Sequence, residues 1–158
     1  AGALVALGGT PAAALADALA DGLAAALERP LPPLAPVGRA GATVTYPIPA
    51  ADGASIDREH EVILARWQGA VYAFALACPH QNTALRWLPG SGADPGRFQC
   101  PKHKSRYRPD GTFIEGRATR GMDRFALRRE GDRVVVDLDA LREQDADPAG
   151  WAAAAVRL

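Results

Sequence analysis

The chain has 158 residues, and its 18 basic and 18 acidic side chains give a formal charge of zero. This balance argues against a protein that binds nucleic acid or another polyanion, because such a protein carries a basic excess. Hydrophobic residues make up 48% of the sequence and charged residues 23%. These values are typical of a soluble globular protein and argue against overall disorder.

The first 28 residues are dominated by Ala and Leu. No charged side chain precedes Asp17, and residues 14–16 (Ala-Leu-Ala) resemble the small-residue end of an export signal, although no basic segment comes before them. Thr10 and Pro11 can start an amphipathic helix, whose apolar face would carry the leucines at positions 15, 19, 23 and 27. The uncharged stretch is shorter than the ~20 residues that span a bilayer. Packing on the same chain, docking to a partner and membrane anchoring therefore remain open.

Residues 29–41 are rich in proline and cannot continue this helix, so we expect an extended, stiff connector. The domain boundary is placed there. Four parts are expected: the apolar segment and helix at 1–28, the linker at 29–41, a β domain at 42–140, and a tail with a short helix at 141–158.

After the connector, short runs rich in Val, Ile, Thr, Tyr and Phe alternate with Gly or Asp turns. These runs predict strands near residues 43–49, 60–67, 70–76, 98–99, 125–129 and 133–138. A short helix is expected at about 148–156. The pattern predicts an all-β fold, a small antiparallel sandwich or barrel, with an N-terminal amphipathic helix and a short C-terminal helix.

Both cysteines and two of the three histidines occur as two similar pairs. One residue separates Cys78 from His80, and two residues separate Cys100 from His103. Each pair follows a predicted strand. His60 belongs to neither pair and is expected on a strand surface, without a role as a ligand.

Four kinds of chemistry can be weighed for these pairs. A disulfide would leave both histidines unexplained, and a Cys–His nucleophile would need only one pair. A zinc site with two Cys and two His usually has at least two residues between the ligands of each pair, and the first pair has one. An iron–sulfur cluster with mixed ligands fits the set best.

The segments Cys-Pro-His at 78–80 and Cys-Pro-Lys-His at 100–103 resemble the binding signature of Rieske [2Fe-2S] proteins. The resemblance covers about residues 43–138. It implies one [2Fe-2S] cluster in which Cys78 and Cys100 hold one iron and His80 and His103 hold the other. It also implies that each pair lies on a loop at the tip of a small three-sheet β structure.

The ligand set has a direct electrostatic consequence. Two ferric ions, two sulfides and two thiolates sum to zero charge when both histidines are neutral, whereas four thiolates would make the cluster doubly negative. Reduction therefore adds an electron to a neutral centre. The potential accordingly rises from about −400 mV into the range of roughly −150 to +300 mV.

Residues 103–107, His-Lys-Ser-Arg-Tyr, resemble the higher-potential, quinol-oxidising branch of the family. This resemblance implies that Ser105 donates a hydrogen bond to a bridging sulfide and that Tyr107 donates one to the thiolate of Cys78. Hydrogen bonds to charged groups are worth about 1.5–3 kcal/mol, so each hydroxyl could raise the potential by up to roughly 60–120 mV. We therefore expect a midpoint between about 0 and +250 mV.

The sequence also departs from that branch at two places. Members usually carry a further cysteine in each loop, and the resulting disulfide braces the cluster, but Thr83 and Lys102 stand at these positions. The proline-containing loop Gly-Pro-Ala-Pro is replaced by Gly-Arg-Ala-Thr at 116–119. Docking of quinol against a cytochrome b subunit is therefore in doubt, whereas electron transfer to another protein is not.

Three functions follow from the resemblance. The first is the iron–sulfur subunit of an exported or membrane-associated oxidoreductase complex, which passes electrons to a c-type cytochrome or another redox subunit. The second is the small subunit of a molybdenum oxidase of the arsenite-oxidase type, and the third is a ferredoxin that feeds an oxygenase. The apolar start of the chain favours a periplasmic or exported location, with a Tat-like signal and membrane association as one interpretation.

The sequence shows no separate substrate site, since it lacks a nucleophile–base pair, a phosphate-binding glycine loop and a suitable pair of carboxylates. Any catalysis would therefore belong to a partner. The stretch around the second pair is locally basic. It could be a solvated rim or a docking surface for an acidic or haem-bearing partner, and its basic residues are Lys102, Lys104, Arg106, Arg108, Arg117, Arg120 and Arg124.

Overall fold

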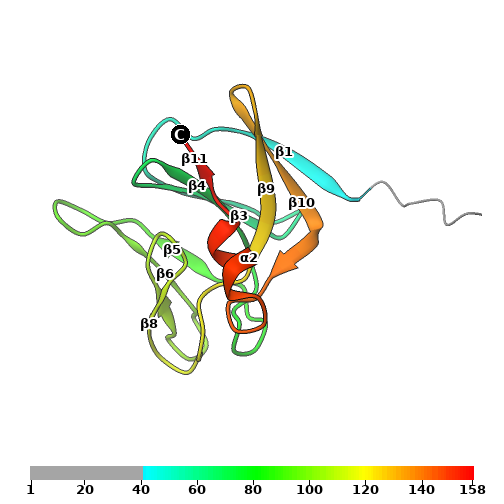
Figure 1. Cartoon of the computed structure of the whole chain (residues 1–158). Helices are drawn as coiled ribbons and strands as arrows, with labels where there is room; N and C mark the ends of the chain where they lie inside the picture. Colours follow the sequence, from blue (N-terminus) through cyan, green and yellow to red (C-terminus); the bar gives the residue numbers. More distant parts are fainter. Residues whose placement is uncertain (1–40) are drawn as a thin grey trace, which may run out of the picture. The chain divides into compact units, whose positions relative to one another are not determined.

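The computed structural model describes residues 41–158, so the predicted helix and most of the predicted linker lie outside the described residues. The described part is almost entirely antiparallel β structure, which confirms the predicted fold class (Figure 1). The strands are β1 (Thr43–Pro47), β2 (Gly53–Asp57), β3 (Val62–Trp67), β4 (Ala70–Ala75), β5 (Arg86–Leu88), β6 (Arg97–Gln99), β7 (Arg106–Tyr107), β8 (Phe113–Glu115), β9 (Arg124–Glu130), β10 (Arg133–Arg142) and β11 (Val156–Arg157), and the helix is α2 (Pro148–Ala153). Within these residues, no helix is long and apolar enough to cross a membrane.

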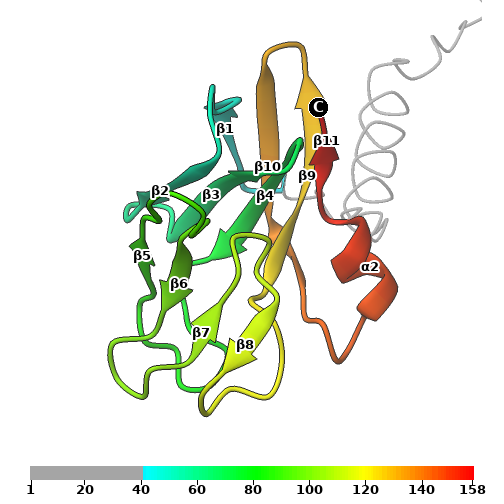
Figure 2. The same ribbon diagram turned by 90° about the vertical axis from the view of Figure 1, so that its left-hand side faces the viewer.

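The strands form two sheets. The larger sheet has the order β1-β10-β9-β4-β3-β2, with β11 added beside β4, and the smaller sheet has the order β5-β6-β7-β8. Figure 2 shows the smaller sheet as a separate group below the strands of the larger one. The resemblance implies three sheets, and the difference has a simple origin. A single residue pair, Phe74 with Arg124, joins β4 to β9 and merges two layers into one curled sheet.

The hairpin of β3 and β4 is the central layer of the domain. Its side chains alternate between two apolar clusters, so both of its faces are buried. Ile63 and Phe74 face the smaller sheet together with both cysteines, whereas Val62 and Ala73 face β9 and β10. This double burial explains why the two strands are nearly continuous apolar runs in the sequence. It also anchors the smaller sheet, which carries the second Cys–His pair after β6.

The C-terminal segment differs in part from the prediction. The side chain of Asp147 caps α2 by accepting a hydrogen bond from the Gly150 N–H at 2.9 Å. The helix ends at Ala153, three residues before the predicted end, because the chain returns to the sheet and Val156 pairs with Val71 in β4. Strand β10 continues to Arg142, beyond the predicted strand end at 138.

Candidate metal centre

Two loops carry the four candidate ligands. The first loop follows β4, with Cys78 and His80, and the second follows β6, with Cys100 and His103. In the first loop, the N–H of Cys78 donates to the carbonyl of Thr83 at 2.9 Å, and the N–H of Asn82 donates to the carbonyl of Cys78 at 2.9 Å. These bonds close the loop back on its cysteine.

The second loop repeats these bonds at the same spacing. The N–H of Cys100 donates to the carbonyl of Ser105 at 2.9 Å, and the N–H of Lys104 donates to the carbonyl of Cys100 at 3.1 Å. The residue four positions after each cysteine has a left-handed backbone, with φ of 51° at Asn82 and 60° at Lys104. Both cysteines are therefore held in the same backbone frame, although the two loops share few residue types.

The two thiols lie together beneath the surface. Cys78 is 1% exposed and Cys100 is 2% exposed, and neither takes part in a disulfide. Burial opposes ionisation of Cys100, but the backbone N–H groups of its loop, the neighbouring Cys78 and the charge of Lys102 outweigh it and lower the pKa of this thiol. A thiolate is the form of cysteine that binds a metal.

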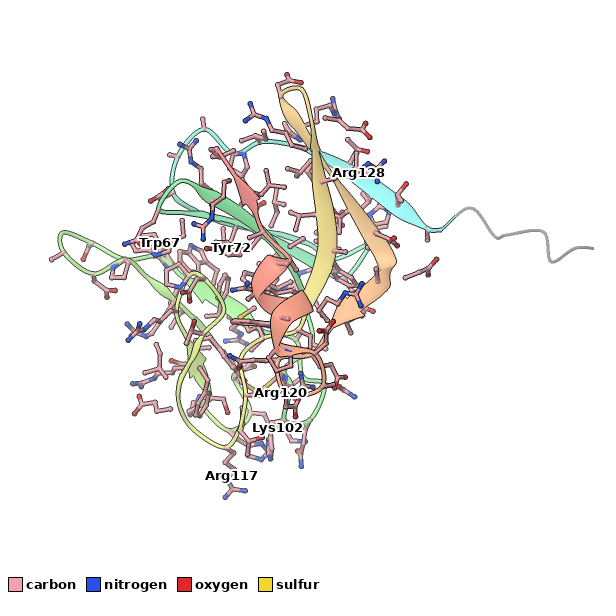
Figure 3. All side chains as sticks on the ribbon, in the orientation of Figure 1. Trp67, Tyr72, Lys102, Arg117, Arg120 and Arg128 are labelled. Carbon is pink, nitrogen blue, oxygen red and sulfur yellow. The ribbon has the colours of Figure 1, made fainter. Side chains whose placement is uncertain are left out.

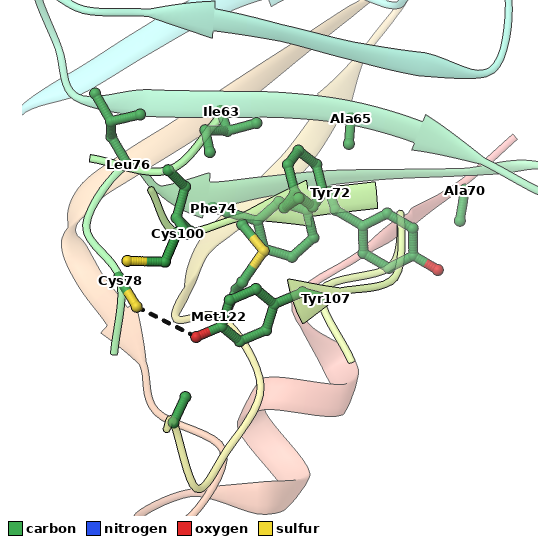
Figure 4. Packing of buried hydrophobic residues seen from close by; sticks show 13 residues of the cluster. Ile63, Ala65, Ala70, Tyr72, Phe74, Leu76, Cys78, Cys100, Tyr107 and Met122 are labelled. Atoms are coloured by element: carbon green, nitrogen blue, oxygen red, sulfur yellow. Dashed lines mark hydrogen bonds between the residues drawn. The ribbon is translucent and has the colours of Figure 1, made fainter. Parts of the chain in front are cut away.

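Tyr107 lies directly against this pair. Its hydroxyl is 3.4 Å from the Sγ of Cys78, as the dashed line in Figure 4 marks, and its side chain is fully buried. Burial, followed by the bond to Cys78, raises the pKa of Tyr107. The phenol therefore keeps its proton and can donate it to a thiolate of Cys78, as the resemblance implies.

The two histidines face each other at the mouth of the loops. Their ring centroids are 4.9 Å apart and their planes are inclined by 78°. The Nδ1 atoms of His80 and His103 are both buried, and neither has a hydrogen-bond partner within the described residues. Loss of solvent, with the charges of Arg117, His80 and Lys102, lowers the pKa of His103, which favours the neutral, metal-binding form.

This donor set fits a two-iron cluster. Two buried thiols and two unpartnered imidazole nitrogens are the sulfur and nitrogen ligands that such a centre needs, two for each iron. Within residues 41–158, no three His, Cys, Asp or Glu side chains meet at one point.

His60 belongs to neither loop, and it lies in a turn and not on the predicted strand surface. Its Nδ1 is 2.8 Å from the Oδ2 of Asp57, in the turn between β2 and β3, and the residue is exposed.

Ser105 is completely buried behind the second loop. Its Oγ accepts two backbone hydrogen bonds, from the N–H of Arg117 and from the N–H of Ala118, each at 3.0 Å. The sequence pattern indicated Ser105 but not these two amides. The one sequence feature that could have indicated them is Gly116, because a glycine in a loop allows another backbone segment, here that of Ser105, to come close.

The basic stretch separates into two groups. Arg106 pairs with Glu115 at 2.5 Å, and Arg120 pairs with Asp123 and lies near two further carboxylates. Arg124 is buried and stacks on Trp151, with 3.6 Å from its guanidinium carbon to the ring centroid. These three arginines therefore have partners within the domain.

The remaining basic side chains, Lys102, Lys104, Arg108 and Arg117, are exposed and form no ion pair with another described residue. Lys102 and Arg117 lie at the same end of the molecule (Figure 3). The charges of both residues lower the pKa of His103, and Lys102 directly precedes His103 in the chain. We define the basic tip as Lys102, Lys104 and Arg117.

Three comparisons relate this chain to known proteins. Residues 49–126 match the family model of the Rieske [2Fe-2S] domain. The ferredoxin component of the alkene monooxygenase system of Xanthobacter autotrophicus is 29% identical over 86 residues, which cover 54% of this chain and 69% of that protein. The structure of the plasma membrane Rieske protein of Synechocystis PCC 6803 aligns with a TM-score of 0.42 and 21% identity, over 53% of this chain and 83% of that one.

The family match confirms the predicted cofactor and its chemistry, whereas the branch of the family and the identity of each ligand stay predictions. The matched range contains both Cys–His loops and the strands that hold them. This chain therefore belongs to the Rieske iron–sulfur family: it binds one [2Fe-2S] cluster and transfers single electrons through it.

Proposed function

We propose that Cys78 and Cys100 hold one iron of the cluster and that His80 and His103 hold the other. The strongest support is a set of four buried groups: two neighbouring thiols and two Nδ1 atoms that have no hydrogen-bond partner within the described residues. When bound, the cluster supplies one-electron redox chemistry. The chain positions its ligands through the repeated backbone frame and keeps water from the sulfur atoms by burying both cysteines.

Iron and sulfide analysis tests this assignment. Wild-type protein should contain two irons and two sulfides per chain, absorb visible light, and give an EPR signal on reduction with an average g below the free-electron value. His80→Ala and His103→Ala should lose the cluster. His60→Ala is the matched control and should keep it, because His60 bonds only to Asp57. A colourless protein with one metal ion per chain would overturn the assignment.

We further propose that this chain is the higher-potential iron–sulfur subunit of an exported or membrane-associated oxidoreductase complex, which delivers electrons to a c-type cytochrome or another redox subunit. The observation that carries this proposal is the hydroxyl of Tyr107 at the Sγ of Cys78. A donor at this position stabilises the extra negative charge of the reduced state and so raises the potential.

The partner should present an acidic surface. His80 and His103 are partly exposed, and the charges of Lys102 and Arg117, which form no ion pair with another described residue, act on His103. Complementary charge would steer an acidic redox protein toward the histidines and orient it for electron transfer.

A second candidate is a ferredoxin that feeds an oxygenase, and the likeness to a ferredoxin component of a monooxygenase system favours it. A molybdenum oxidase of the arsenite-oxidase type is a further setting for the first proposal. A redox titration separates the two candidates. A midpoint between about 0 and +250 mV supports the higher-potential subunit, whereas a value below about −100 mV would contradict the assigned roles of Ser105 and Tyr107 and favour the ferredoxin.

A further inference from the structure

The direction in which the Ser105 hydroxyl can donate its proton is restricted by its neighbours. An sp³ hydroxyl oxygen has two lone pairs and one proton. The N–H groups of Arg117 and Ala118 occupy both lone pairs at 3.0 Å, so the hydroxyl proton must point away from them. The backbone of Ser105 belongs to the frame of the second loop, where its carbonyl accepts a hydrogen bond from the Cys100 N–H at 2.9 Å. With both lone pairs occupied, the hydroxyl proton is left to donate, and the proposed role of Ser105 directs it to the sulfur atoms of the cluster.

Gly116 makes this approach sterically possible. It has φ of +113°, and a Cβ at this position would lie 2.4 Å from the Cα of Ser105 and 2.9 Å from its Oγ. No side chain fits there unless the backbone moves. The N–H groups of the next two residues reach the Ser105 oxygen only because the chain passes this close.

We infer that residues 116–118 form a positioning strap, an inference that rests on the proposed function of the site. Gly116 brings the amides of Arg117 and Ala118 to the Ser105 oxygen. These two hydrogen bonds direct the Ser105 hydroxyl toward the sulfur atoms and make it a stronger donor. We name residues 116–118 the amide strap. Within the described residues, both amides donate to the Ser105 oxygen, so the strap acts through Ser105.

The sign of the effect follows from hydrogen-bond cooperativity. A hydroxyl that accepts two N–H bonds is polarised and becomes a stronger donor. A stronger donor to sulfur stabilises the more negative, reduced state, and so it raises the midpoint potential. Loosening the amide strap should therefore lower the midpoint, even though the Ser105 hydroxyl is still present.

Gly116→Ala tests the inference in the cluster-containing protein. We expect a lower midpoint in redox titrations followed by EPR, with two irons per chain retained. Gly131→Ala is the matched control, because Gly131 also has a positive φ (+62°) but an added Cβ meets no atom within 4 Å. It carries the same type of backbone strain without the crowding, and its midpoint should equal that of the wild type.

A double-mutant cycle with Ser105→Ala separates the possible failures. If the strap acts through the hydroxyl, Gly116→Ala should lower the midpoint in the wild type and leave it unchanged in the Ser105→Ala background. An unchanged midpoint in Gly116→Ala, with a clear shift in Ser105→Ala, would overturn the strap and leave the role of Ser105 intact. If Ser105→Ala itself causes no shift, the strap fails together with the proposed role of Ser105, while the iron analysis still reports on the ligands.

If Gly116→Ala does not fold, a second pair of variants tests the same inference. Arg117→Pro deletes one of the two amide donors, whereas Arg117→Ala removes the same charged side chain and keeps the N–H. The midpoint of the proline variant should be lower than that of the alanine variant. This difference should disappear when Ser105 is also replaced by Ala. Equal midpoints for the two variants would contradict the inference.

Discussion

The two ligand loops share one backbone frame but differ in what surrounds it. Each cysteine N–H bonds to the carbonyl five residues later, and a hydroxyl residue stands at that position in both loops. Thr83, in the first loop, is partly exposed, and its Oγ1 reaches only the carbonyl of Gln81 at 3.5 Å. Ser105, in the second loop, is fully buried beneath the amide strap. The shared frame thus positions the ligands, whereas the groups that can tune the potential lie on the side of the second loop.

The largest expected effect tests whether the two loops hold one centre. Cys78→Ala and Cys100→Ala each remove a ligand from a different loop. If both belong to one iron of a single cluster, either variant should lose nearly all iron and all visible absorption, because the cluster cannot assemble on the remaining ligands. Metal analysis of the purified variants measures this loss. Retention of half the iron in either variant would instead mean that each loop binds its own ion.

The next effect compares the two hydroxyls at equivalent positions. Ser105→Ala should lower the midpoint by roughly 60–120 mV, the value of one hydrogen bond to a charged group. Thr83→Ala should leave the midpoint at the wild-type value, because the Thr83 hydroxyl faces its own loop. Potentiometric titration of both variants under identical conditions measures the difference. Equal shifts would show that burial and direction of the hydroxyl do not matter, and would remove the asymmetry between the loops.

A smaller effect concerns the charge around the histidines, which comes almost entirely from the second loop and its strap. Reduced protein should donate electrons faster to the anion hexacyanoferrate(III) than to the cation tris(phenanthroline)cobalt(III), once the driving forces are matched. Replacing Lys102 and Arg117 by Gln should slow the reaction with the anion by roughly tenfold at low ionic strength. Stopped-flow rates measure this change.

Salt gives the control for that experiment. At about 1 M ionic strength the screening length is about 3 Å, so the wild type and the variant should react at the same rate. The variant Arg128→Gln changes a charge at an exposed site in β9, paired with Glu130, and should leave both rates unaltered. Rates that do not depend on ionic strength would contradict docking at the basic tip.

Much of the fold and the ligand set could be predicted because their signals are local. The apolar runs of β3 and β4 and the two Cys–His pairs lie in short stretches of sequence. By contrast, β5, β7 and β8 have two or three residues each, too few for alternation to appear, and their pairing depends on the ligand loops. These strands were not predicted.

The distant contacts could not be predicted for a different reason. Arg124 looks like a surface cation in the sequence, but its guanidinium donates to the carbonyls of Asp110 and Trp151 at 2.7 and 2.8 Å, and stacks on the indole of Trp151. These partners lie 14 and 27 positions away. Burial of a charge requires such compensation, and only the folded chain supplies it. The amide strap on Ser105 likewise depends on residues 12 and 13 positions away.

The smallest expected effect lies in the turn between β2 and β3, which supports the first loop through the bond from the Leu76 N–H to the Glu61 carbonyl at 2.8 Å. Hydrogen bonds from Tyr46 and then from His60 lower the pKa of Asp57 from 3.8 to about 2. Because this pKa is lower in the folded protein, the carboxylate stabilises the fold above about pH 4, and the contribution is lost as the pH falls toward 2.

Asp57→Asn should therefore lower the melting temperature at pH 6, and the difference from wild type should shrink steadily between pH 4 and pH 2. Glu59→Gln is the matched control, because only the backbone N–H of Glu59 bonds to Asp57, so its melting temperature should follow the wild type at every pH. Neither variant should change the iron content or the midpoint, since the turn holds the base of the first loop and contributes no group to the sulfur atoms. A constant difference across the whole pH range would mean that the Asp57 carboxylate stabilises this turn by its shape and not by its charge.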